Sequence, residues 1–261
     1  MHKMNTILEC FDELLSRSLK GKPFIYEENG TLSLHFDITA IQSQMRPEAP
    51  DQLVLGYTQS MMGFLLFKSH PESIAMIGLG GGSIPKYCHR YLPEASISVV
   101  EINPDVIALR DQFCIPKNDE RFQVLCEDGA HFVRRASNQF DVLLVDGFDV
   151  TGQPAQLCSQ RFYDDCHDAL TENGIMVVNL CGGDLRSGAL ASRIRKSFDN
   201  AVIMMDSEDG YNKIVFAGKG KVLCHSDKQI NSYLSQIERS HPTNLRHTAQ
   251  HLRQNRHLTR A

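Results

Sequence analysis

Acidic residues follow apolar runs at several points in the middle of the chain. Glu101, Asp128 and Asp146 each stand at or just beyond the end of such a run, and Asp149 comes shortly after Asp146. A carboxylate at the end of a strand can accept hydrogen bonds from both hydroxyls of a ribose. Glu101 stands at the distance along the chain from the glycines near residue 80 that this role requires. Several carboxylates at strand ends suit a ligand with amino groups and positive charge better than a ligand with a pyrophosphate.

A glycine cluster lies about twenty residues before Glu101. It follows the apolar run 74–77, precedes a segment of helical pattern that starts at Ser83, and consists of Gly78, Gly80, Gly81 and Gly82. Glycines let a ligand approach the backbone closely, and the unpaired N–H groups at a helix start can donate to that ligand. The cluster and Glu101 together predict a bound adenosine-type ligand; the alternative is a tight turn with no ligand.

Apolar runs and helical patterns alternate regularly from residue 74 onward, which predicts a parallel sheet with helices on both faces. Such a sheet places the carboxyl ends of its strands along one edge, where ligands bind, so the glycines and the acidic residues should meet there. The expected strands are 74–79, 96–101, 122–126, 140–145 and 174–180, with helices at 83–91, 104–112, 129–136, 159–170 and 186–197.

The two ends of the chain have a different pattern. A small N-terminal unit, 1–52, is expected at the start of the chain. It consists of a helix over 1–20, a hairpin over 24–36 with an Asn-Gly turn and a third strand over 38–45. A buried helix over 53–68 then leads into the main domain, 53–220, which ends with an antiparallel pair of strands, 201–205 and 213–217. The rest, 221–261, reads as a helical tail that packs on this domain or trails from it.

Composition excludes several classes of protein. The formal net charge of −4 argues against general nucleic-acid binding. The longest apolar run, 61–67, is far shorter than the roughly 20 residues of a membrane-spanning helix, and no secretory signal is visible. We expect a cytoplasmic protein with neither a membrane nor a nucleic acid as partner. The cysteines contain no Cys-x-x-Cys motif, and His247 and His251 lack a further ligand, so no metal site is expected.

The motifs of residues 24–220 resemble, in order, those of the spermidine synthase family (polyamine aminopropyltransferases). The motifs that carry the resemblance are Gly80-Gly81-Gly82-Ser83, Val100-Glu101-Ile102-Asn103, Glu127-Asp128-Gly129, Asp146-Gly147-Phe148-Asp149 and Tyr57-Thr58-Gln59. The resemblance implies a small N-terminal β domain followed by a Rossmann-like, methyltransferase-type α/β domain. It also implies a homodimer.

The resemblance implies transfer of an aminopropyl group from decarboxylated S-adenosylmethionine, a co-substrate rather than a tightly bound cofactor, to a polyamine such as putrescine. Asp146 matches the catalytic base, and Asp149 a residue that helps to hold the amine. Glu101 matches the residue on the ribose, and Asp128 and Gly129 those on the adenine. The remaining matches are Tyr57 and Gln59 for the substrate, and Gln42, Gly78, Gly80, Gly82 and Ser83 for the donor.

Other roles are open for some of these residues. Asp128 could be only a helix cap, Asp149 a turn former and Tyr57 a core residue. Ser83 replaces an aspartate that grips the donor's amino group in the family, and Thr58 and Gln59 replace a polar and acidic pair. Two alternative functions therefore stand beside aminopropyl transfer. They are methyl transfer from S-adenosylmethionine, which Ser83 would tolerate, and nucleoside binding without catalysis.

Overall fold

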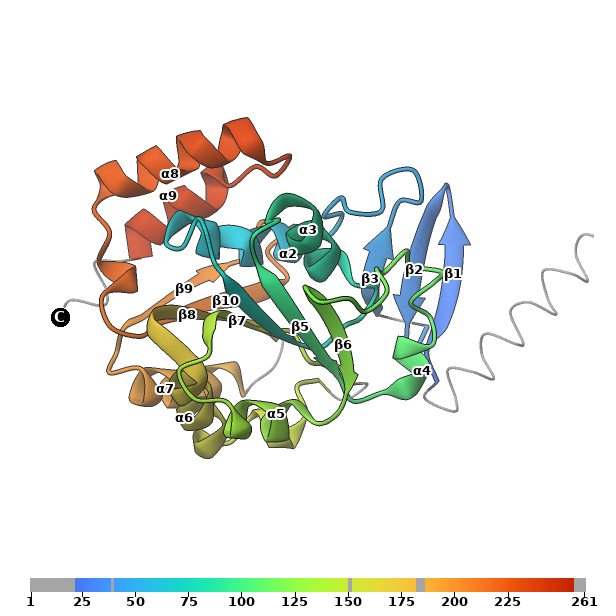
Figure 1. Cartoon of the computed structure of the whole chain (residues 1–261), viewed down its shortest axis with the longest axis horizontal. Coiled ribbons are helices and arrows are strands. Elements are labelled where there is room, and N and C mark those ends of the chain that lie inside the picture. Colours follow the sequence, from blue (N-terminus) through green and yellow to red (C-terminus); the bar gives the residue numbers. More distant parts are fainter. Residues whose placement is uncertain (1–21, 39, 150–151, 182–185, 256–261) are drawn as a thin grey trace, which may run out of the picture.

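The computed structural model describes residues 22–38, 40–149, 152–181 and 186–255. Strands β1 (Phe24–Glu28), β2 (Thr31–His35) and β3 (Ile41–Met45) form a small antiparallel sheet, seen in blue in Figure 1. Its first turn is Asn29-Gly30, with φ values of 49° and 72°, as the sequence predicts. The third strand begins at Ile41 rather than at residue 38. The helix predicted over 1–20 lies outside the described residues.

The main sheet has seven strands in the order β6-β5-β4-β7-β8-β10-β9. The strands from β6 to β8 pair in parallel, and β10 pairs antiparallel with both β8 and β9. This arrangement confirms the predicted parallel sheet and its antiparallel end. The strand bounds are β4 Ser73–Ile77, β5 Ser96–Glu101, β6 Phe122–Cys126, β7 Phe140–Val145, β8 Leu170–Cys181, β9 Val202–Asp206 and β10 Asn212–Gly218.

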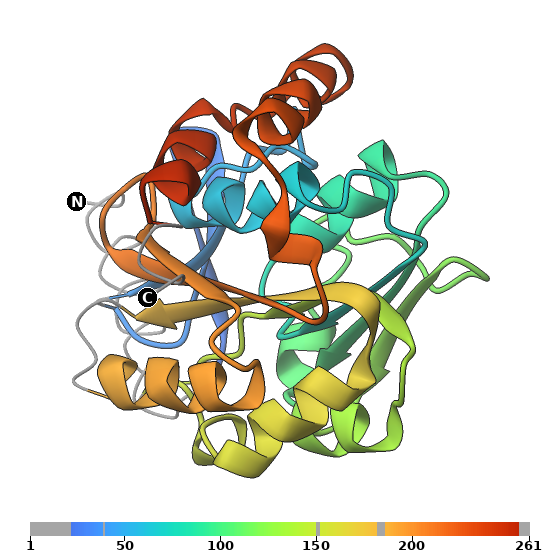
Figure 2. The same cartoon turned by 90° about the vertical axis from the view of Figure 1, so that its left-hand side faces the viewer.

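Helices cover both faces of this sheet, and each face has its own apolar core. Side chains alternate along β4, so that Ile74 and Met76 join one core while Ala75 and Ile77 join the other. On one face lie α5 (Gly129–Arg135), α6 (Gln160–Ala169) and α7 (Ser187–Ser197). On the opposite face lie α2 (Gly56–Met61), α3 (Ser83–Tyr91), α8 (Asp227–Ser240) and α9 (Arg246–Asn255), as Figures 1 and 2 show.

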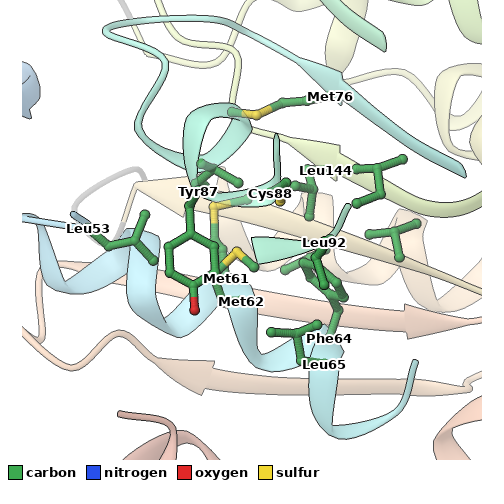
Figure 3. Packing of buried hydrophobic residues seen from close by; sticks show 14 of the residues in the cluster. Leu53, Met61, Met62, Phe64, Leu65, Met76, Tyr87, Cys88, Leu92 and Leu144 are labelled. Carbon is green, nitrogen blue, oxygen red and sulfur yellow. The ribbon is translucent and has the colours of Figure 1, made fainter. Parts of the chain in front are cut away.

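The core that contains Ile74 and Met76 joins the N-terminal part of the main domain to the tail. Figure 3 shows Tyr87 and Cys88 of α3 beside Met61 and Met62. Ile237 of α8 and other apolar residues of the tail are buried in the same core. Helices α8 and α9 therefore pack on the main domain.

Two predicted helices differ from those observed. The helix predicted over 53–68 is divided into α2 and a 3-10 turn, η1 (Met62–Leu66), with helix-weakening Gly63 at the change. The helix predicted over 104–112 ends early: α4 spans Pro104–Ile107, and hydrogen-bonded turns follow. These turns bring Phe113 and Ile115 back against the glycine loop, so tertiary packing overrides the helical pattern. The remaining 3-10 turns are η2 (Ala155–Leu157) and η3 (Val222–Cys224).

The turn after β4 depends on Gly78. Its φ is 95°, and a Cβ there would collide with the backbone oxygen of Asp146. We expect Gly78→Ala to lower the free energy of unfolding by about 2 kcal/mol or more, and the melting temperature by roughly 4–8 °C. Gly188→Ala is the matched control, because Gly188 lies in α7 with no atom near its missing Cβ. Equal melting temperatures for the two variants would contradict this account of the turn.

Candidate active site

A cleft of about 570 Å³ opens at the carboxyl ends of the parallel strands. The N-terminal sheet forms one wall, since Gln42 and Ser43 of β3 line the cleft together with the loop after β2. All the predicted site residues line it except Gln59 and Gly82. Those that it brings together are Gln42, Tyr57, Gly78, Gly80, Ser83, Glu101, Asp128, Gly129, Asp146 and Asp149.

Glu101 is fixed at the end of β5 by backbone N–H groups. Its Oε2 accepts a hydrogen bond from the N–H of Leu79 in the glycine loop at 3.0 Å, and its Oε1 accepts from the N–H of Asn103 at 2.8 Å. Each carboxylate oxygen has further acceptor capacity. The side chain is thus held in a single orientation, with room on both oxygens for a diol in the cleft.

Asp128 is a helix cap that also lines the cleft. Its Oδ1 accepts from the N–H groups of Ala130 at 2.7 Å and His131 at 3.3 Å, at the start of α5. Oδ2 accepts no hydrogen bond from the described part of the chain. The capping role and a ligand role are therefore compatible, because they use different oxygens. Gly129 follows directly, and a side chain there would collide with Ile77.

Asp146 lies just beyond β7 and is held by two side chains. The Tyr57 hydroxyl donates to Oδ2 at 3.2 Å, and the Asn179 amide donates to Oδ1 through Nδ2 at 2.8 Å. Burial raises the pKa of Asp146 to about 6, although the hydrogen bonds from Asn179 and Tyr57 oppose this rise. At neutral pH the carboxylate is thus mostly ionised, yet more basic than an ordinary aspartate.

Tyr57 extends from α2 into the cleft and acts there as a donor. Burial raises the pKa of its hydroxyl well above the usual value, and the negative charge of Asp146 raises it further. The phenol therefore keeps its proton at any working pH and continues to donate to Asp146. Tyr57 packs against the core and contacts Asp146 through its hydroxyl, so both positions that the sequence left open are partly occupied.

The cleft is acidic. Its lining includes five carboxylates and, among the described residues that line it, no lysine, arginine or histidine; the acids are Asp37, Glu101, Asp128, Asp146 and Asp149. Such a lining attracts cations and disfavours phosphates.

No group of three His, Cys, Asp or Glu residues in the described ranges is arranged to hold a metal ion. The described helices include none long and apolar enough to cross a membrane.

Comparisons with known proteins show the family to which the chain belongs. Residues 54–181 match the family described as the spermine/spermidine synthase domain. The polyamine aminopropyltransferase of Neisseria meningitidis serogroup A is 35% identical over 240 residues, which cover 85% of this chain and 91% of that protein. The chain belongs to the spermidine synthase family.

Two solved structures show the fold of this family and of its methyltransferase neighbours. Human methyltransferase-like protein 13 in complex with SAH has a TM-score of 0.64 at 22% identity, covering 71% of this chain and 92% of that one. A spermidine synthase in complex with the transition-state analogue AdoDATO has a TM-score of 0.61 at 22% identity, covering 76% and 74%. The predicted α/β fold with a small N-terminal sheet is confirmed.

Position 83 is where this spermidine synthase family member differs most clearly from the motif. Ser83 is buried, and its hydroxyl lies 3.3 Å from the Ser43 hydroxyl and 3.4 Å from the backbone oxygen of Gln44, both on β3. One turn further along α3, Lys86 donates to the backbone oxygen of Phe113 at 2.7 Å, and burial lowers its pKa to about 8. Ser83 thus offers the cleft a neutral hydroxyl and joins α3 to the N-terminal sheet.

The structure does not bring Gln59 and Gly82 into the cleft. Gln59 lies two residues after Tyr57 on α2, so it faces another way and donates to the backbone oxygen of Leu53 at 3.1 Å. There it lines a smaller cavity of about 330 Å³. Gly82 caps α3 with a φ of 68°, and its missing side chain makes room for Ile115 rather than for a ligand.

Asp149 lies at the exposed end of the cleft. Its backbone exchanges two hydrogen bonds with Gly152, at 2.9 and 3.1 Å. The residue lines the cleft, and its role in holding the amine stays a prediction.

Asn179 and Asp37 are polar cleft residues that the sequence analysis did not predict. Asn179 is a single polar residue within the apolar run of β8, close to the carboxyl end of that strand. The acidic residues were identified by their place at the ends of apolar runs, and the same criterion could have identified Asn179. Asp37 follows β2 in a loop, and no pattern in the sequence indicates that this loop reaches the cleft.

Proposed function

We propose that this protein transfers an aminopropyl group from decarboxylated S-adenosylmethionine to a polyamine such as putrescine, with Asp146 as the general base. The observation that carries the proposal is the environment of Asp146. It is a half-buried carboxylate with a raised pKa, fixed by two donors, in a cleft whose ionisable lining residues are acids and tyrosine. Such a group is suited to take a proton from an amine.

The nucleoside part of the donor would lie between β4 and β5. Glu101 would accept hydrogen bonds from the two ribose hydroxyls, because both of its oxygens are held in place and retain acceptor capacity. Asp128 Oδ2 and Gly129 would contact the adenine, and Gln42 would cover the nucleoside from the N-terminal sheet. The backbone of the glycine loop would approach the donor closely at Gly78 and Gly80.

The reaction follows from this placement. The amine nitrogen attacks the methylene carbon of the aminopropyl group that is bonded to the sulfonium sulfur, and a C–N bond forms as this C–S bond breaks. The electron pair of the broken bond goes to sulfur, and methylthioadenosine leaves. The nitrogen gives up a proton to Asp146. Both substrates are cations, so Asp146 and Asp149 also offset their mutual repulsion.

Methyl transfer from ordinary S-adenosylmethionine is the second candidate, and Ser83 favours it. An aspartate at this position would repel the carboxylate of that donor, whereas a neutral hydroxyl tolerates it. The other acids of the cleft favour the decarboxylated donor, which has one negative charge fewer. We therefore rank aminopropyl transfer first.

Ser83→Asp tests the donor assignment. We expect it to raise the preference for decarboxylated over ordinary S-adenosylmethionine by tenfold or more, since a charged hydrogen bond contributes about 1.5–3 kcal/mol. The Ser43 hydroxyl, 3.3 Å from the present Ser83 oxygen, can hold the new carboxylate in place. Ser83→Asn is the matched control, because it adds the same shape without charge. A preference that stays unchanged, or changes equally in both variants, would rule out this role of position 83.

Calorimetric titration tests the proposed function as a whole. The purified protein is titrated with decarboxylated S-adenosylmethionine, S-adenosylmethionine and methylthioadenosine. We expect the decarboxylated donor to bind more tightly than S-adenosylmethionine. Tighter binding of S-adenosylmethionine would favour methyl transfer, and binding of none of the three would exclude a nucleoside site.

The family resemblance also supports a homodimer, which sedimentation velocity would test. The N-terminal sheet carries exposed apolar side chains that an interface would cover: Tyr26 is 42% exposed and Ile41 is 48% exposed. A cytoplasmic location stays a prediction from the sequence.

A further inference from the structure

Asn179 lies directly beside Asp146 in the sheet. Strands β7 and β8 are parallel, and Val145 pairs with Val178. Asp146 follows Val145 and Asn179 follows Val178, so these two residues are neighbours. The Asn179 side chain is only 3% exposed, and it lines the cleft. Its Nδ2 lies 2.8 Å from Asp146 Oδ1, which is the shorter of the two hydrogen bonds to this carboxylate.

The orientation of the Asn179 amide is fixed by chemistry. An ionised carboxylate only accepts hydrogen bonds, so the amide must present its NH₂ group to Asp146. Its carbonyl oxygen, Oδ1, is then buried and receives no hydrogen bond from the described residues. A buried acceptor without a donor is costly, and such groups in folded proteins call for an explanation. Because Asn179 lines the cleft, a ligand N–H group can supply the missing donor.

We propose that Asn179 is a positioning residue that acts on both partners of the proton transfer. Through Nδ2 it holds the Asp146 carboxylate in one plane, and through Oδ1 it accepts a hydrogen bond from the nitrogen of the acceptor amine. This proposal rests on the proposed function, and it adds a requirement to the acceptor. The reacting nitrogen must carry one N–H for Asp146 and another for Asn179 while its lone pair stays free for the attack, as in a neutral primary amine.

The consequences of losing Asn179 differ from those of a packing defect. The amide stabilises the ionised form of Asp146, so its removal raises the pKa of that carboxyl above its present value near 6. The acid limb of kcat/KM against pH should then move upward by about one pH unit. Loss of Oδ1 should raise KM for the amine, whereas binding of methylthioadenosine should be unaffected.

Asn179→Val and Asn179→Thr are the test variants, since both are compatible with a strand. We expect Asn179→Val to lower kcat/KM by about 10–100-fold with the shifted acid limb. Asn179→Thr keeps a hydroxyl and should recover part of both effects. Val178→Ala is the control, because Val178 packs in the core on the other side of β8. It should lower the melting temperature without moving the acid limb.

A second measurement separates this proposal from the proposed function. The titration of the Asp146 carboxyl is followed by ¹³C NMR in the wild type and in Asn179→Val. A folded Asn179→Val protein with an unchanged Asp146 titration and an unchanged KM for the amine would overturn the role of Asn179. A shifted titration in a protein that turns over no amine would instead overturn aminopropyl transfer and support the Asn179–Asp146 contact.

Discussion

Asp146→Asn is expected to lower kcat/KM for aminopropyl transfer by about 10²–10⁴-fold, the range of a general base. The amide cannot take the proton of the attacking amine, although it fills the same space between Tyr57 and Asn179. Affinity for methylthioadenosine should stay within about twofold, because the nucleoside residues are untouched. The measurement is steady-state turnover, combined with calorimetric binding of the nucleoside.

The same substitution should leave the fold intact. The raised pKa of Asp146 means that its ionised form is disfavoured in the folded state, so stability contributed by this group falls as pH rises through about 6. A neutral amide avoids that cost. We therefore expect the melting temperature of Asp146→Asn at pH 8 to equal or exceed that of the wild type.

Asp141→Asn is a matched control at the opposite end of β7. Burial alone would raise the pKa of Asp141, but hydrogen bonds from the Glu72 N–H and from the Lys68 and Thr171 side chains lower it. This aspartate is structural, so Asp141→Asn should lower the melting temperature and leave kcat/KM of the folded fraction unchanged. Full turnover by Asp146→Asn, or equal loss in both variants, would contradict the assignment of Asp146 as base.

Glu101→Gln is expected to weaken the binding of adenosyl ligands by about 10–100-fold, since a charged hydrogen bond contributes about 1.5–3 kcal/mol. Two backbone N–H groups, those of Leu79 and Asn103, now donate to the carboxylate oxygens. A glutamine can accept from only one of them with its oxygen and must turn its NH₂ group toward the other. The substitution thus removes the charge and also disturbs the glycine loop.

Glu127→Gln is the control for Glu101. Glu127 follows the neighbouring strand β6, but its carboxylate pairs with Arg135 and does not line the cleft. Affinity for methylthioadenosine should therefore be unchanged in this variant. Similar losses in both variants would mean that the effect is one of overall charge and that Glu101 has no specific contact with the nucleoside.

The main sheet could be predicted because it is built from local, repetitive signals. Runs such as 142–145 are apolar and flanked by helical patterns, so their alternation specifies a parallel sheet whose carboxyl ends meet at one edge. Glu101 and Asp146 could be placed in one cleft for the same reason. Their positions depend only on where their strands end.

What could not be predicted depends on contacts between distant segments. The segment after α4 turns back because Phe113 packs against the glycine loop, and nothing in residues 104–112 indicates that contact. Gln59 stands at a position of the family motif, but the rotation of α2 directs Tyr57 to the cleft and Gln59 away from it. Asp37 reaches the cleft only because the small sheet docks on α3.

Product analysis tests the central claim most directly. The purified chain is incubated with decarboxylated S-adenosylmethionine and putrescine, and mass spectrometry follows methylthioadenosine and the aminopropylated amine, with Asp146→Asn in parallel. We predict that the wild type forms the two products in equal amounts and that the variant forms little of either. A folded wild type that binds methylthioadenosine but aminopropylates no diamine, or that methylates an acceptor with S-adenosylmethionine instead, would contradict the account.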